Sequence, residues 1–118
     1  MDDKALAEAF FATWAEADTA ARAAALSKVA TDNVAYADPN SAQTLSSRDQ
    51  LNEMLGHFSA NMAGGSAWVV GTPDGHNGWI RATVAFGMNG SEMMRGQYIM
   101  RRDGDLLTQI VGFMGMGE

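Results

Sequence analysis

The stretch WIRATVAFGMNGSEMMRGQYIMRRDGDLLTQIVGFM, residues 79–114, decides the fold. Two tight-turn signals divide it, Asn89-Gly90 and Asp103-Gly104-Asp105. Asn-Gly between apolar runs is the strongest short-range signal for a two-residue hairpin. Strands are therefore predicted over 79–88, 93–102 and 106–114. Because strands joined by such short turns run in opposite directions, the segment predicts an antiparallel meander.

Upstream of the meander, apolar residues recur at helical spacing. Helices are predicted over 4–16, over about 19–29 after a cap at Asp18 or Thr19, and from a cap at Ser46 or Ser47 to Gly64-Gly65. The third helix carries an apolar stripe: Leu51, Met54, Leu55, Phe58 and Met62. A strand at 67–71 and a turn at 73–75 or 77–78 then lead into the meander. Helices first and strands last predict an α+β fold, and residues 1–118 are expected to form one domain.

A short alternating run lies between the second and third helices. Val34, Tyr36 and Asp38 share one face if this run is a strand, and Pro39 favours an extended backbone at Asp38. A carboxylate beside an aromatic ring among apolar residues can have its pKa raised by desolvation, which makes Asp38 a candidate general base. Asp-Pro is also a common way for a strand to enter a loop, so a purely structural role is the alternative.

Composition excludes several classes of function. The net charge is −6, and only Arg101-Arg102 are adjacent among the eight basic residues, so no nucleic-acid partner is expected. The absence of cysteine excludes disulfides, thiolate zinc sites and cysteine nucleophiles. No apolar run approaches the roughly 20 residues that span a bilayer, and the first residues are acidic. We therefore predict a cytoplasmic protein that does not bind membranes.

Histidines and glycines suggest neither a metal site nor a cofactor site. His57 borders the stripe of the third helix, where it is either a half-exposed boundary residue or a proton carrier that faces a pocket. His76 is expected to be exposed in a turn. It could share a face with Asp74, but no third ligand is evident. The glycine-rich segment 112–117 precedes no helix, so it is interpreted as a flexible tail and not as a phosphate loop.

Alternation in the meander predicts which side chains face the helices. On the first strand these are Ala82, Val84, Phe86 and Met88. On the next strand they are Arg95, Gln97 and Ile99. Met94, Tyr98 and Met100 are then expected to face outward. Because monomers rarely expose such apolar patches, this outer face predicts a homodimer.

Several features together resemble the NTF2-like superfamily, which includes SnoaL-like polyketide cyclases and ketosteroid isomerase. They are the aromatic first helix, the strand end Tyr36-Ala37-Asp38-Pro39, the third helix and the closing hairpin from 96 to 113. The resemblance covers about residues 10–114. It implies a cone of three N-terminal helices packed on a strongly curved, mostly antiparallel sheet, with a pocket at the open end and pairing through the outer sheet face.

The resemblance also implies roles for individual residues. Asp38 matches the catalytic base of the isomerase branch, whereas the oxyanion-binding tyrosine and the second acid of that branch fall at Phe10 and Gln97. The indole N–H of Trp14 is expected to find an acceptor such as Asp38. A small apolar ligand is expected to contact eight residues: Phe10, Trp14, Tyr36, Met54, His57, Phe58, Phe86 and Gln97.

Three functions are compatible with these features, because one fold of this kind hosts many activities. The first is an isomerase- or cyclase-like enzyme in which Asp38 removes a proton beside a carbonyl while Gln97, Trp14 or Tyr36 stabilises the oxyanion. The second is a non-catalytic binder of a small hydrophobic ligand. The third is a dimeric interaction module that uses the outer sheet face.

Overall fold

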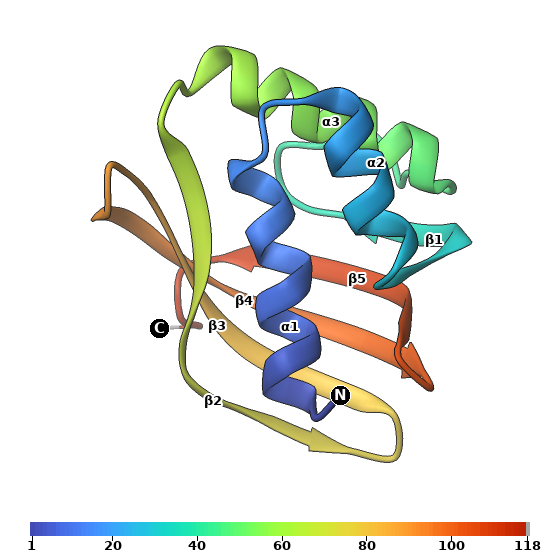
Figure 1. Ribbon diagram of the computed structural model, residues 1–118. Coiled ribbons are helices and arrows are strands. Elements are labelled where there is room, and N and C mark those ends of the chain that lie inside the picture. Colours follow the sequence, from blue (N-terminus) through green and yellow to red (C-terminus); the bar gives the residue numbers. More distant parts are fainter. Residues whose placement is uncertain (118) are drawn as a thin grey trace.

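One strongly curved sheet of five strands carries three helices on its concave side (Figure 1). The computed structural model describes residues 1–117. Its elements are α1 (Asp3–Ala12), the 3-10 turn η1 (Thr13–Ala15), α2 (Thr19–Ser27), β1 (Ala30–Ala37), α3 (Arg48–Asn61), β2 (Gly65–His76), β3 (Trp79–Met88), β4 (Ser91–Asp103) and β5 (Leu106–Met114). Within this part of the chain no helix is long and apolar enough to cross a bilayer.

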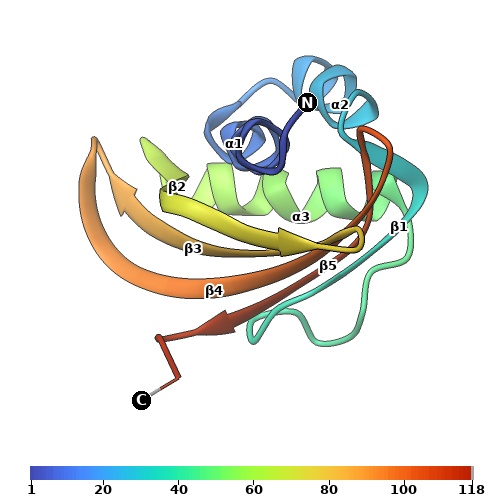
Figure 2. The ribbon, with the colours of Figure 1, turned by 90° about the horizontal axis from the view of Figure 1, so that it is seen from below.

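The strands follow the order β1-β5-β4-β3-β2, so the sheet is open and its edges are β1 and β2. β1 runs parallel to β5, and the other neighbours are antiparallel. Figure 2 shows the sheet curving beneath the helices, with α1 lying along the hollow. The predicted α+β architecture is confirmed.

Most predicted elements are present, with shifts at their ends. β3 and β5 have the predicted bounds, and Asp18 and Ser47 cap α2 and α3 by accepting backbone N–H groups. The first helix ends earlier than predicted, at Ala12, and continues as η1. β2 is longer than predicted because its pairing with β3 continues, after a register shift, to the turn at Asn77-Gly78.

A buried arginine positions the turn that carries Trp14. Arg22 on α2 is 1% exposed, and its guanidinium donates to the Glu16 carbonyl oxygen at 2.6 Å and to Asn52 Oδ1 on α3 at 2.5 Å. Buried charges require such partners because desolvation is costly. Through Arg22, the two bonds tie the chain just after η1 to both α2 and α3. They therefore limit the movement of the turn that carries Trp14.

The predicted faces of β4 are wrong because a β-bulge shifts its register. Gly87 pairs with Glu92, whereas the preceding residue Phe86 pairs with Met94, so Met93 has no partner on β3. An unshifted hairpin would pair Phe86 with Met93. A shift of one residue turns every later side chain of a strand to the opposite face.

Tyr98 and Met100 consequently lie under the helices and are almost fully buried. Arg95, Gln97 and Ile99 lie on the outer face, where Arg95 is exposed and the other two are half-buried. The apolar set that motivated the homodimer is therefore not on this surface. The homodimer itself stays a prediction.

Deletion of Met93 tests the role of the bulge. The deletion should force Arg95 and Gln97 beneath the helices or unpair β4, and we expect it to lower the free energy of unfolding by about 4 kcal/mol or more. The control is Met93→Ala, which keeps the extra residue and truncates a side chain that is 62% exposed. Urea denaturation that shows equal losses for both variants would contradict the assignment of the bulge.

Candidate functional site

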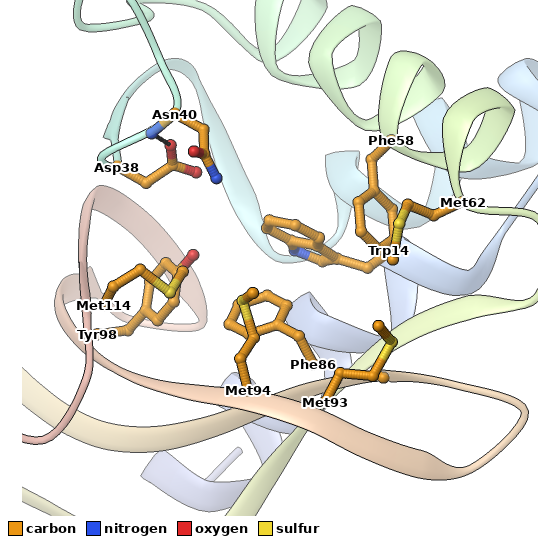
Figure 3. Close-up of a pocket in the computed structure, with 11 residues that line it drawn as sticks. Trp14, Asp38, Asn40, Phe58, Met62, Phe86, Met93, Met94, Tyr98 and Met114 are labelled. Carbon is orange, nitrogen blue, oxygen red and sulfur yellow. Dashed lines mark hydrogen bonds between the residues drawn. The ribbon is translucent and has the colours of Figure 1, made fainter.

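A cavity of about 250 Å³ opens between η1, α3 and the end of the β3–β4 hairpin (Figure 3). Its walls are mainly aromatic rings and methionine side chains. The lining residues are Trp14, Asp38, Asn40, Phe58, Met62, Phe86, Gly87, Met93, Met94, Tyr98 and Met114. Among the described residues, Asp38 is the only charged side chain in this lining.

Trp14 is the centre of the aromatic wall. Its ring meets Phe58 of α3 edge-to-face at a centroid distance of 5.1 Å and Phe86 of β3 at 5.4 Å. Such T-shaped pairs are favourable because the positive edge of one ring meets the negative face of the other. The contacts join η1, α3 and the sheet, so the wall is held by three separate elements.

Methionines surround the mouth of the cavity. Met93 and Met94 of β4 are 62% and 51% exposed, and Met114 at the end of β5 is 40% exposed. Unbranched thioether side chains can adapt their shape to different apolar molecules. The sequence analysis did not place these three residues in a pocket, because their positions depend on the bulge and on where β5 ends.

Asp38 is held at the edge of the cavity by three hydrogen bonds. Its Oδ1 accepts the backbone N–H groups of Asn40 at 2.8 Å and Ser41 at 2.9 Å, and its Oδ2 accepts the Tyr36 hydroxyl at 2.5 Å. Asp38 therefore forms the turn after β1 and also lines the cavity. A carboxylate offers about four acceptor positions, so one remains for a ligand.

Two buried tyrosines extend this hydrogen bonding into the sheet. The hydroxyls of Tyr36 on β1 and Tyr98 on β4 are 3.1 Å apart. With Asp38 ionised, the single hydroxyl proton of Tyr36 goes to the carboxylate, so Tyr98 donates to the Tyr36 oxygen. We refer to these three residues as the Asp38–Tyr36–Tyr98 chain.

The pKa values of both tyrosines are raised well above the ordinary value. For Tyr36 the causes are burial, then the neighbouring Tyr98 and Asp38. For Tyr98 burial is again the main cause; the charge of Asp38 adds to it, and the hydrogen bond with Tyr36 acts in the opposite direction. Burial penalises the charged phenolate, so both side chains remain neutral near pH 7.

Gly112 makes room for the ring of Tyr98. The two residues are partners across β4 and β5, and a Cβ atom at position 112 would lie 2.5 Å from Tyr98 Cζ and 2.9 Å from its Oη. Only a glycine allows the ring to lie across β5 at this point. Gly112 lies inside β5, as the predicted strand over 106–114 requires, so the flexible tail predicted for 112–117 does not begin at Gly112.

The structure brings only some of the expected ligand-binding residues to the cavity. Trp14, Phe58 and Phe86 line it together with Asp38. Tyr36 is fully buried and reaches the site through its hydroxyl. Sequence reasoning missed Tyr98, which was expected to face outward, in addition to the methionines at the mouth.

Four expected residues lie elsewhere. Phe10 is fully buried in the core, and Met54 packs half-buried against that core. The side chain of His57 is 73% exposed on α3 beside Glu53 and does not line this cavity, which favours the boundary alternative over the pocket-facing proton carrier. Gln97 faces outward because of the bulge and donates to the Met116 carbonyl oxygen.

The indole nitrogen of Trp14 also departs from expectation. Asp38 was its expected acceptor, but Nε1 has no hydrogen-bond partner among the described residues. The Asp38 carboxylate instead accepts hydrogen bonds from the Tyr36 hydroxyl and from the backbone N–H groups of Asn40 and Ser41.

Comparison with solved structures identifies the fold. A candidate isomerase of the SnoaL-like family from Agrobacterium tumefaciens matches 95% of this chain and 96% of its own at a TM-score of 0.83 and 21% identity. The fold is NTF2-like. A Catenulispora acidiphila protein with a ketosteroid isomerase-like fold, in complex with trimethylamine, covers 94% and 85% at a TM-score of 0.75 and 13% identity. An LEH-like epoxide hydrolase from M. tuberculosis covers 95% and 77% at a TM-score of 0.67 and 10% identity.

These matches concern the fold alone, since their identities are low. No family model matches the sequence, and no curated protein matches it. The NTF2-like resemblance is confirmed as a fold, and the cavity lies on the concave side of the NTF2-like sheet.

Substitution of Gly112 tests how Tyr98 is positioned. The backbone angle φ of Gly112 is not positive, so Gly112→Ala acts by crowding the ring and should cost about 1–3 kcal/mol of unfolding free energy. In a Tyr98→Leu background most of this cost should disappear, because the two residues are in contact. An equal cost in both backgrounds, measured by urea denaturation, would show that the contact does not exist.

Proposed function

We propose that the protein binds a small, largely apolar carbonyl compound in this cavity and moves a proton on it, with Asp38 as the general base. One observation supports this proposal above all. Asp38 and Tyr98 both line the cavity, and the buried hydroxyl of Tyr36 joins them. A proton acceptor and a neutral hydroxyl donor therefore face the same apolar space.

The roles follow from the hydrogen-bonding capacity of each group. The free acceptor position of the Asp38 carboxylate takes a proton from the carbon beside the carbonyl. The carbonyl oxygen then gains negative charge, and the Tyr98 hydroxyl stabilises it by donating a hydrogen bond. Rotation about the C–O bond of Tyr98 is enough to turn its proton from Tyr36 to the ligand. Asp38 completes an isomerisation by returning the proton to a different carbon.

Tyr98 supplies the donor that the isomerase resemblance placed elsewhere. Phe10 has no hydroxyl and is buried in the core, and Gln97 lies on the outer face. The raised pKa of Tyr98 suits a donor that stays protonated while charge develops on the substrate. The apolar walls strengthen such an interaction by excluding water.

Proton exchange on enolisable cyclic ketones, beginning with 1-tetralone, tests this proposal. In D₂O the protein should accelerate deuterium incorporation beside the carbonyl, followed by NMR. Asp38→Asn should slow this exchange about 10²–10⁴-fold because the base is lost. Tyr98→Phe should slow it about 10²-fold because the donor is lost.

The control is Asp103→Asn, which removes an exposed acid outside the cavity. Near-ultraviolet circular dichroism should verify the fold of each variant, because Asp38 also forms a turn. Exchange by folded Asp38→Asn at the wild-type rate would refute the catalytic role.

A second candidate is a non-catalytic binder of a small organic cation. Asp38 is held by the turn and is the only charged side chain lining the cavity among the described residues, beside the rings of Trp14, Phe86 and Tyr98. Aromatic faces attract ammonium groups. The Catenulispora acidiphila protein of the same fold is in complex with trimethylamine.

Choline and its neutral isostere 3,3-dimethylbutan-1-ol separate the two candidates. A cation binder should prefer choline by about tenfold or more in calorimetric titrations, since one good charge contact is worth that factor. Asp38→Asn should abolish the preference. Equal affinity, or tighter binding of the neutral compound, would exclude the second candidate.

A further inference from the structure

The indole N–H of Trp14 is an unused hydrogen-bond donor at the cavity. The side chain is 5% exposed, and Nε1 is the one buried side-chain nitrogen or oxygen of residues 1–117 without a partner. A buried donor left unpaired is costly, and native structures contain few of them. In Figure 3 the nitrogen lies on the ring edge that is turned toward Phe86.

Packing alone does not account for this nitrogen. The ring contacts of Trp14 are with Phe11, Phe58, Phe86 and Tyr36, and none of these residues forms a hydrogen bond with the indole nitrogen. The indole ring cannot easily swing to find a protein acceptor, because four aromatic rings pack around it. The space next to the ring that a new acceptor can enter is the cavity itself.

We propose that Trp14 selects the ligand by donating a hydrogen bond from Nε1 to an acceptor oxygen, such as that of a ketone or an ester. This inference rests on the proposed use of the cavity and names the class of ligand. An indole nitrogen only donates, so its partner must be an acceptor, and an ammonium group cannot serve. A hydrocarbon leaves the N–H unpaired, gains no hydrogen bond from it and therefore binds more weakly than a ketone.

The same oxygen can be shared with Tyr98. A carbonyl oxygen has two lone pairs, and both Trp14 and Tyr98 line the cavity. Two neutral donors on one oxygen make a site that favours a ketone and favours its enolate more strongly. Trp14 thereby adds a second donor to the one that the proposed proton transfer already uses.

A cycle of two ligands and two proteins tests the proposal. The ligands are 1-tetralone and tetralin, which differ in the carbonyl oxygen, and the proteins are wild type and Trp14→Phe. Affinities come from ligand-observed NMR. Wild type should prefer 1-tetralone, and the preference should fall about tenfold in Trp14→Phe, the value of one hydrogen bond to a buried donor.

Both ligands contact the smaller phenyl ring of Trp14→Phe, so any loss of packing weakens both of them. The ratio of the two affinities therefore reports the hydrogen bond alone. Phe58→Leu is the matched control: it removes a ring in contact with Trp14 but no donor, so it should weaken both ligands equally. A second readout needs no variant of Trp14. The indole proton of Trp14 in wild type should shift downfield on titration with 1-tetralone and not with tetralin.

The outcomes are distinct. An unchanged preference in folded Trp14→Phe, or an indole proton that ignores 1-tetralone while the ketone binds, overturns the role of Trp14 and leaves the proposed function standing. Failure of both ligands to bind wild type overturns the proposed use of the cavity, and this inference with it.

Discussion

The register of β4 against β3 is the constraint on which the site depends. The unpaired Met93 moves Tyr98 to the concave side, where its hydroxyl meets that of Tyr36 and its ring lies over Gly112. Without this shift β4 would contribute no hydroxyl to the cavity. A single extra residue in a hairpin therefore determines whether Asp38 has a polar neighbour across the apolar space.

Burial of the two tyrosine hydroxyls is tolerated because both are hydrogen-bonded. Tyr98 donates to the Tyr36 oxygen, and Tyr36 donates to the Asp38 carboxylate. Asp38 is in turn oriented by the backbone N–H groups of its own turn, so the chain of hydrogen bonds begins in a loop and ends in the centre of the sheet. Such fully paired networks are stiff and specific. The indole nitrogen of Trp14 is the exception, because it is buried and has no partner among the described residues. This contrast is the reason for proposing that a ligand supplies its acceptor.

Patterns that depend on near neighbours could be predicted from the sequence. The Asn89-Gly90 turn, the caps at Asp18 and Ser47 and the end of the strand before Asp38 are of this kind, since backbone chemistry acts over a few residues. The inward position of Tyr98 depends on a bulge for which alternation carries no signal. Gly87 was the one local sign of it: a side chain there would overlap the Ser91 carbonyl oxygen.

Spectrophotometric titration of the tyrosines tests the inward position of Tyr98 most directly. The chain has two tyrosines, and burial raises the pKa of both above the ordinary value of about 10. Phenolate should therefore be absent from the folded protein at pH 10–11. Since only the unfolded chain ionises there, stability should fall as the pH rises above about 10, and phenolate should form only with unfolding. Ionisation of one tyrosine near pH 10 in folded protein, lost in Tyr98→Phe, would place Tyr98 in solvent and contradict the account.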